Sequence, residues 1–202
     1  MTQKEDSIIA AAGGGFDTLL NRLLKNPLLV EESADTLPDS TSVLNLSVKN
    51  KLQCTALHVA AFGGHWRCVE ALLRKNTDIK AQNDRASDAT PLPTLDLESR
   101  DVDGTTPFAF ASLGGHLQCL EILYEYGADV NTISGNSSAL IGSSLSGHTA
   151  CCDFILKHCK DDTVDAQTDT GQTALMQACT GGHMDDTVDA QTDTGQTALM
   201  QA

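Results

Sequence analysis

Three features are scarce in this chain, and each scarcity narrows its function. Aromatic residues make up 4% of its 202 residues, too few for broad surfaces that stack bases or sugars. Lys and Arg number 13 against 27 Asp and Glu, a net charge of −14, which opposes binding to nucleic acid or anionic membranes. No run approaches the ~18 apolar residues of a membrane-spanning helix, and residues 1–7 are too polar for a secretory signal. These absences predict a cytoplasmic or nuclear protein that binds neither nucleic acid nor membrane.

A four-residue phrase recurs along the chain instead. It is Thr-Ala-Leu-His at 55–58, Thr-Pro-Phe-Ala at 106–109, Ser-Ala-Leu-Ile at 138–141 and Thr-Ala-Leu-Met at 173–176. A Gly-His pair follows each phrase, with its His ten positions after the opening Thr or Ser. The second and third phrases start 32 positions apart and the third and fourth 35, whereas the first two start 51 apart. Such self-similarity indicates stacked supersecondary units rather than one closed core.

The residues inside each unit predict a pair of helices. An opening Thr or Ser can cap the first helix, and the Gly before each His can end it and reverse the chain. In the second helix, apolar residues recur at offsets 13, 14, 17 and 18, as at Cys68, Val69, Leu72 and Leu73. This i, i+3, i+4 pattern is one apolar helical stripe, and it occurs in three successive units.

In these motifs the chain resembles the ankyrin repeat family, whose unit is a β-turn followed by two antiparallel helices. The resemblance implies an all-α ankyrin-repeat solenoid of about four units, the last one truncated. The expected organisation is a degenerate N-terminal helix pair (1–30), an acidic loop (31–49), a repeat (50–83), an acidic Pro-containing insertion (84–101), a repeat (102–134), a degenerate repeat (135–168), an incomplete repeat (169–184) and a duplicated truncated segment (185–202).

The carboxyl end departs from the repeat pattern. Residues 161–178 reappear unchanged as residues 185–202, and the outer helix expected after His183 is missing. We expect this sequence to be a fragment, a splice product or an assembly error, with residues from about 185 onward frayed because their apolar face lacks a neighbour.

Cysteine and histidine residues raise the question of a metal site or a nucleophile. The densest set is His148, Cys151, Cys152, His158 and Cys159. The repeat register places these residues around a helix, whereas zinc ligands converge on one point, so buried free thiols are the preferred interpretation. A Cys54–His58 pair has the same weakness, because the resemblance implies a structural role for His58. The sequence therefore predicts no catalytic residue, no metal and no cofactor.

The resemblance implies a non-enzymatic protein-binding module, expected to act as a monomer. Its partner is expected to contact a concave surface made by inner helices and by finger loops between helix pairs. The expected contact residues are Lys80 and Gln82 on one finger, Asn131, Thr132 and Ser134 on the next, Thr168, Asp169 and Thr170 on a third, and Phe110 and Ser112 on an inner helix. An acidic patch of Asp96, Glu98, Asp101 and Asp103 in the insertion favours a basic protein partner.

Two alternatives stay open. The alternative to an independent binding module is the N-terminal substrate- or partner-targeting region of a larger enzyme or ubiquitin-ligase adaptor, because fold alone does not select a function. Leu123 followed by Asp129, Val130 and Asn131 looks like the site that asparaginyl hydroxylases modify in ankyrin fingers. Asn131 is therefore a candidate for hydroxylation, and its simpler role is to stabilise the turn.

Overall fold

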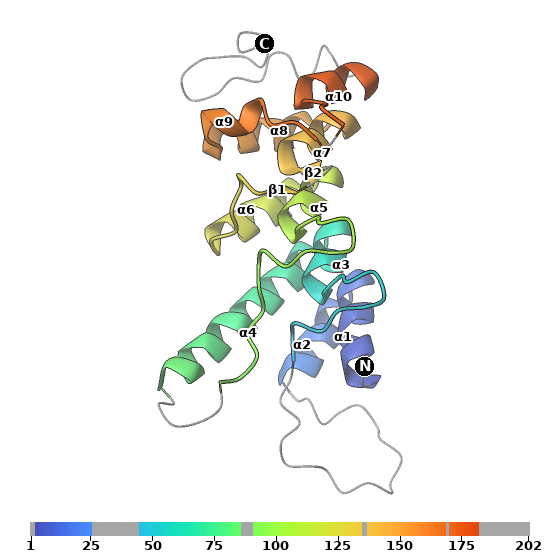
Figure 1. Ribbon diagram of the computed structural model, residues 1–202. Helices are drawn as coiled ribbons and strands as arrows, with labels where there is room; N and C mark the ends of the chain where they lie inside the picture. The colour runs from blue at the N-terminus through green and yellow to red at the C-terminus, as the bar shows by residue number, and fades with distance from the viewer. Residues whose placement is uncertain (1–2, 26–44, 86–90, 135–136, 169, 182–202) are drawn as a thin grey trace, which may run out of the picture.

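The computed structural model is a single row of stacked helix pairs (Figure 1). It describes residues 3–25, 45–85, 91–134, 137–168 and 170–181. The predicted acidic loop at 31–49 lies largely outside these ranges, as does the duplicated segment at 185–202. The described helices are α1 (Gln3–Gly13), α2 (Asp17–Lys25), α3 (Ala56–Phe62), α4 (Trp66–Arg85), α5 (Pro107–Leu113), α6 (Leu117–Glu125), α7 (Ala139–Ser146), α8 (Thr149–His158), α9 (Asp161–Val164) and α10 (Ala174–Gly181).

The helices form two rows. Helices α1, α3, α5, α7 and α10 make contacts in that order and form the inner row, while α2, α4, α6 and α8 form the outer row (Figure 1). The strongest contacts between units join neighbours along the row, as in a solenoid. The predicted all-α solenoid is therefore confirmed, and none of its described helices is long and apolar enough to cross a membrane.

The predicted apolar stripes form the core. Leu72 in α4, Leu123 in α6 and Ile155 in α8 occupy the same offset in successive units, and each is 0% exposed. Leu20 of α2 is equally buried and extends this line into the N-terminal helix pair. Burying such a side chain contributes about 1.5–3 kcal/mol, so the outer row depends on stacking more than on helix propensity.

The phrase residues cap the inner helices as predicted. Thr106 Oγ1 accepts a hydrogen bond from the backbone N–H of Ala109 (3.3 Å), and Ser138 Oγ accepts one from Ile141 (3.2 Å). Helices α3, α5 and α7 are each followed by a glycine in a left-handed conformation: φ is +69° at Gly64, +72° at Gly115 and +71° at Gly147. An L-residue with a side chain rarely adopts this conformation.

Helix α4 corrects the sequence interpretation. It runs for 20 residues, from Trp66 to Arg85, whereas α6 spans nine residues and ends just before Gly127. Between Cys68 and Arg85 the chain has no Gly or Pro to stop the helix. Part of the extra length between the first two phrases is therefore helical, and Lys80 and Gln82 lie on this helix and not on a finger.

The predicted finger before α7 is a short hairpin. Its strands are β1 (Ile133–Ser134) and β2 (Ser137–Ser138), which pair antiparallel with Ile133 opposite Ser138. Gly127 precedes it, two residues after the last residue of α6, in the left-handed conformation (φ +90°) typical of a helix stop.

Candidate protein-interaction surface

Apolar side chains are exposed on the inner row of helices, where packing does not require them. Phe62 of α3 is 53% exposed, Leu145 of α7 41% and Met176 of α10 53%, and Phe110 of α5 is half-buried. Phe62 and Leu145 lie seven positions after the Thr or Ser that opens their phrase, Phe110 lies four after it and Met176 three. Positions that differ by three or four share one side of a helix. We call this set, Phe62, Phe110, Leu145 and Met176, the inner-helix face.

The aromatic part of the inner-helix face is ordered by ring contacts between units. The rings of Phe62 and Phe110 meet edge to face, with centroids 5.6 Å apart and an interplanar angle of 84°. Phe110 also meets the buried His58 ring edge-on at 5.8 Å. Edge-to-face pairs are favourable, so two neighbouring helices hold these rings in a fixed arrangement.

In the acidic patch, Glu98 and Asp101 hold neighbouring parts of the chain, whereas Asp96 and Asp103 are exposed. Glu98 accepts hydrogen bonds from Asp129 N–H (2.9 Å) and Thr132 Oγ1 (2.8 Å) in the next finger. Asp101 accepts from the backbone N–H groups of Asp103 (3.0 Å) and Thr105 (2.8 Å). The Asp96 and Asp103 side chains are exposed, although Asp96 Oδ1 accepts from Glu98 N–H (3.0 Å).

Asn131 is held firmly at the start of its finger. Its backbone N–H and its Nδ2 both donate to Asp129 Oδ1, at 2.9 and 3.0 Å. Its Oδ1 accepts from Lys160 N–H (2.7 Å) and Thr163 Oγ1 (2.9 Å) in the following unit. The amide therefore links two units, in agreement with a turn-stabilising role.

Some expected contact residues are not available to a partner. Ser112 is 0% exposed, and its hydroxyl donates to the Ala139 carbonyl of the next inner helix. Thr168 is 7% exposed, and its hydroxyl hydrogen-bonds to that of the exposed Thr170. Both expectations were wrong because a hydroxyl on a helix or turn can satisfy a neighbour's backbone or side chain instead of facing solvent. Ser134 lies in β1, and Asp169 is outside the described residues.

Five of the seven cysteines are buried and act as apolar groups, whereas Cys159 is half-buried and Cys179 exposed. Burial is the largest cause of a raised pKa for the Cys119 thiol, to about 12, and for Cys151, to about 11. Cys152 is also buried, and its thiol donates to Ser143 Oγ at 3.2 Å. A thiol that stays protonated is a poor nucleophile and a poor metal ligand. No group of three or more His, Cys, Asp or Glu within the described ranges is arranged to hold a metal ion.

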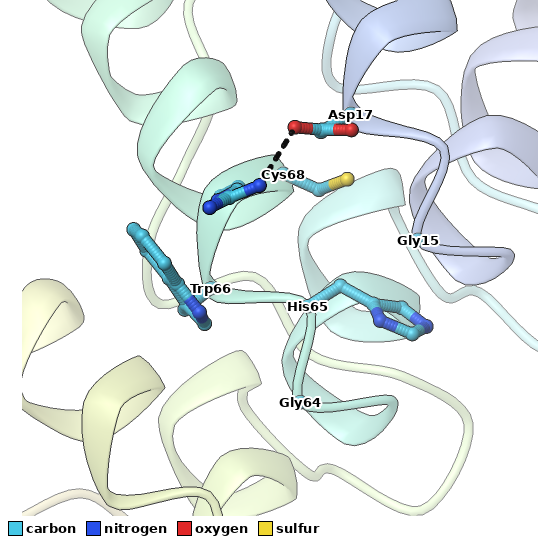
Figure 2. A pocket seen from close by; sticks show the side chains of 7 residues that line it. Gly15, Asp17, Gly64, His65, Trp66 and Cys68 are labelled. Carbon is cyan, nitrogen blue, oxygen red and sulfur yellow. Dashed lines mark ion pairs between the residues drawn. The ribbon is translucent and has the colours of Figure 1, made fainter.

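A small pocket lies where the first helix pair meets the second (Figure 2). Its volume is ≈ 240 Å³, and it is lined by Gly15, Asp17, Gly64, His65, Trp66, Arg67 and Cys68. Its polar groups are already engaged: His65 Nε2 donates to the Gly13 carbonyl (3.0 Å), and Arg67 pairs with Asp17 (3.7 Å). Burial, with a smaller effect of Asp17, raises the pKa of the Cys68 thiol. The pocket is smaller than typical small-molecule sites of about 300–1,000 Å³, and its Cys and His are unsuited to nucleophilic chemistry.

The Gly-His turns contain contacts that the sequence interpretation missed. His116 Nε2 donates to the Phe62 carbonyl (3.0 Å), as His65 does to Gly13 one unit earlier. The His116 ring lies against Gly64, where an added Cβ would be 2.5 Å from Nδ1. The constant Gly-His offset was visible in the sequence, but the bond partner lies about 50 residues away and was not.

The stacked helix pairs define a helical repeat protein. The family model described as Ankyrin repeats (3 copies) matches residues 7–134 and 89–166. The chain belongs to the ankyrin repeat family, whose repeats form a non-catalytic protein–protein interaction module.

Similar proteins include regulators and ligases. The NF-kappa-B inhibitor cactus of Drosophila melanogaster is 31% identical over 147 residues, covering 66% of this chain and 29% of that protein. The ankyrin repeat and KH domain-containing protein mask-1 of Caenorhabditis elegans is 28% identical over 135 residues, or 57% of this chain and 5% of that protein. The E3 ubiquitin-protein ligase XBAT32 of Arabidopsis thaliana is 32% identical over 102 residues, or 44% and 20%. The chain thus spans less than a third of each relative.

Proposed function

We propose that this chain binds a protein partner through the inner-helix face and the adjoining fingers, and that it has no catalytic activity of its own. The observation that carries the proposal is the exposure of Phe62, Leu145 and Met176 on helices whose opposite sides are fully packed. Exposed apolar groups gathered on one side of a protein mark interaction sites. Aromatic anchors contribute strongly to binding when a partner desolvates them.

The first partner to test is a protein of the NF-kappa-B class. Two relatives that match about two thirds of this chain are named NF-kappa-B inhibitor cactus. The cactus match covers 66% of this chain, which is more than any one of its helix pairs. Phe62→Ala combined with Phe110→Ala should weaken such a complex at least about tenfold, since buried aromatic anchors often contribute 2 kcal/mol or more.

Calorimetry with purified NF-kappa-B protein would measure this loss, and Tyr124→Ala on outer helix α6 is the matched control. Tyr124 is 39% exposed, so the control removes an aromatic side chain from the opposite row. An unchanged affinity for the inner-face variant, or an equal loss in both variants, would contradict the proposed surface. Lack of binding by the unmodified chain would reject this partner class.

An acidic contribution to binding is the finer part of the proposal. Asp103 is exposed beside the fingers, and the whole chain carries a net charge of −14. Asp103→Lys should slow association with a basic partner by about two- to fivefold at low salt and less at high salt. Stopped-flow association rates at two salt concentrations would show this. Equal association rates for the unmodified chain and Asp103→Lys would show that Asp103 does not contribute to the contact.

The second candidate function is partner or substrate targeting for a ubiquitin ligase. Two E3 ubiquitin-protein ligases of plants match 44% and 38% of this chain. The inner-helix face would then recruit the substrate, and a ligase module elsewhere would modify it. Ubiquitylation of a captured partner by the full-length protein, lost on mutation of Phe62, distinguishes this function from inhibition.

Three further properties are proposed with the binding function. The thiols of Cys54, Cys68 and Cys119 are free and buried, which suits the reducing cytoplasm or nucleus. The chain is proposed to act as a monomer, and light scattering would test this.

Hydroxylation of Asn131 also remains a proposal. Mass spectrometry of the protein isolated from cells would reject it if no added oxygen were found on that residue.

A further inference from the structure

The insertion between the second and third helix pairs is attached to helix α4 by two asparagine side chains. Asn76 Nδ2 donates to the Leu95 carbonyl (3.0 Å), and its Oδ1 accepts from Leu95 N–H (2.7 Å). Asn83 makes the same pair of bonds with Leu92, at 2.9 and 2.8 Å. Each carboxamide therefore satisfies both backbone groups of one residue in the insertion.

The spacing of the two contacts matches on both sides. Asn76 and Asn83 are seven residues apart, or about 10.5 Å along a helix. Leu92 and Leu95 are three residues apart, or about 9 Å in a polyproline II conformation, whose three-residue turn places both on one side. Pro91 and Pro93 favour that conformation. Leu95 itself is 1% exposed, and Ile79, which lies between the two asparagines on α4, is 4% exposed, so apolar burial reinforces the hydrogen bonds.

The same segment continues directly to the next finger. Three residues after Leu95, the Glu98 carboxylate accepts from Asp129 N–H (2.9 Å) and Thr132 Oγ1 (2.8 Å). Hydrogen bonds to a charged acceptor are stronger than neutral ones. Residues 91–98 therefore connect α4 with the finger that follows the next helix pair, α5 and α6, and we call them the brace.

The segment before helix α3 also holds the brace and the residues that follow it. Ser47 Oγ donates to the Thr94 carbonyl, and Lys49 Nζ donates to the Arg100 carbonyl (2.8 Å). In Figure 1 the long helix α4 extends beyond the other outer helices, so the Asn83 contact lies on the part of α4 that continues past the length of α6. Both asparagines that hold the brace lie on this additional length of α4.

We infer that Asn76 and Asn83 are positioning residues that act through the brace and Glu98 to fix the finger at residues 129–134. The finger begins at Asp129, whose carboxylate in turn holds Asn131. Loosening the brace on α4 frees Glu98 to move, and the finger loses its acceptor. The elongated α4 thereby controls the order of a partner-contacting loop through the brace. Only the statement that the loop contacts a partner rests on the proposed function.

Hydrogen exchange of backbone amides in the full chain tests this inference without any partner. In Asn83→Ala, exchange of the Asp129 amide should be about tenfold faster, as expected when a hydrogen bond to a charged group is weakened. Glu98→Ala should have at least the same effect. Gln82→Ala, a change at the exposed neighbouring position on α4, should leave Asp129 exchange unchanged. Alanine is the best helix former, so none of these changes on α4 should unwind it.

A double-mutant cycle separates positioning from general stability. If Asn83 acts through Glu98, then Asn83→Ala should add no further acceleration at Asp129 in a Glu98→Ala background. Exchange at the core residue Leu120 reports overall stability, and it should not change in Asn83→Ala. Unchanged Asp129 exchange in Asn83→Ala, equal acceleration at Asp129 and Leu120, or additive effects in the double variant would each overturn the inference.

Discussion

Two neighbouring junctions in the inner row of helices are tied by buried polar side chains of different chemistry. Between α3 and α5, His58 Nε2 donates to the Thr105 carbonyl (3.2 Å), while Nδ1 accepts from Thr55 N–H (3.1 Å). Between α5 and α7, the Ser112 hydroxyl donates to the Ala139 carbonyl. The Thr55 contact requires an unprotonated Nδ1, so His58 is neutral when it ties its junction. One junction therefore depends on a titrating group and the other does not.

The comparison shows that a unit without a buried histidine at the position of His58 can still be joined to its neighbour by a polar contact. The position of His58 is taken by Ala109 in the next unit and by Ile141 in the unit after that. Both replacements are buried, at 4% exposure each. A serine from the opposite end of the inner helix supplies the polar contact instead. The degenerate units are thus held by other contacts rather than left open.

The largest expected effect comes from the helix that both junctions share. Phe108 of α5 is 1% exposed, and α5 packs on both α3 and α7. Phe108→Ala should lower the free energy of unfolding by about 3–5 kcal/mol, the usual cost of truncating a buried aromatic side chain. Urea unfolding followed by circular dichroism measures the loss. Phe62→Ala on the exposed face is the control, and a similar loss in both would contradict the assignment of the two faces.

The next effect tests a feature that both junctions have in common. Gly64→Ala and Gly115→Ala each place a Cβ 2.5 Å from the Nδ1 atom of the next unit's histidine, at φ of +69° and +72°. Each change should cost about 1–3 kcal/mol. Gly127→Ala, at φ of +90° with nothing within 4 Å of its Cβ, isolates the backbone strain and should cost less. If all three variants unfold at the same urea concentration, the histidine contacts do not contribute.

The smallest effect separates the junctions by pH. Burial is the largest cause of the lowered pKa of His58, so the unfolded chain binds a proton more readily than the folded one. Stability from this group is complete above the unfolded pKa of about 6.5 and is lost as pH falls below it, by at most about 1.4 kcal/mol per pH unit. Urea unfolding at pH 8 and pH 5.5 should show this loss, and His58→Gln should reduce it.

Ser112→Ala provides the matched comparison at the other junction. Removing its hydroxyl should cost about 1 kcal/mol, and the cost should be the same at both pH values because serine does not titrate. A pH-dependent cost for Ser112→Ala, or an undiminished pH response in His58→Gln, would contradict the distinction between the junctions.

Local rules in the sequence predicted most of the fold. Thr106 and Ser138 cap their helices, Gly64 and Gly115 reverse the chain, and Leu72 is buried, because each role depends on a short and repeated spacing. The full length of α4 was missed although the sequence between Cys68 and Arg85 has no helix breaker. The later phrases start 32 and 35 positions apart, and the expectation that the unit with α4 has the same length outweighed that local signal.

The candidate site was harder to predict because it depends on contacts between distant segments. Ser112 and Thr168 were expected at the surface, but hydrogen bonds to neighbouring groups bury both. Glu98 was expected to meet a partner, but the next finger already engages its carboxylate. Phe62 could have been recognised from the sequence as a candidate, since it is a large apolar residue directly before the Gly-Gly turn of its inner helix. Apolar residues exposed together on one side of a protein indicate contact with another molecule, whereas a single one does not.

Site-specific photocrosslinking in the protein's own cells tests the central claim most directly. A photoreactive phenylalanine analogue would replace Phe62 on the inner-helix face in one variant and Glu121, exposed on outer helix α6, in the other. The account predicts a discrete protein adduct from position 62 and little or none from position 121. Adducts of equal yield from both positions, or none from position 62, would contradict it.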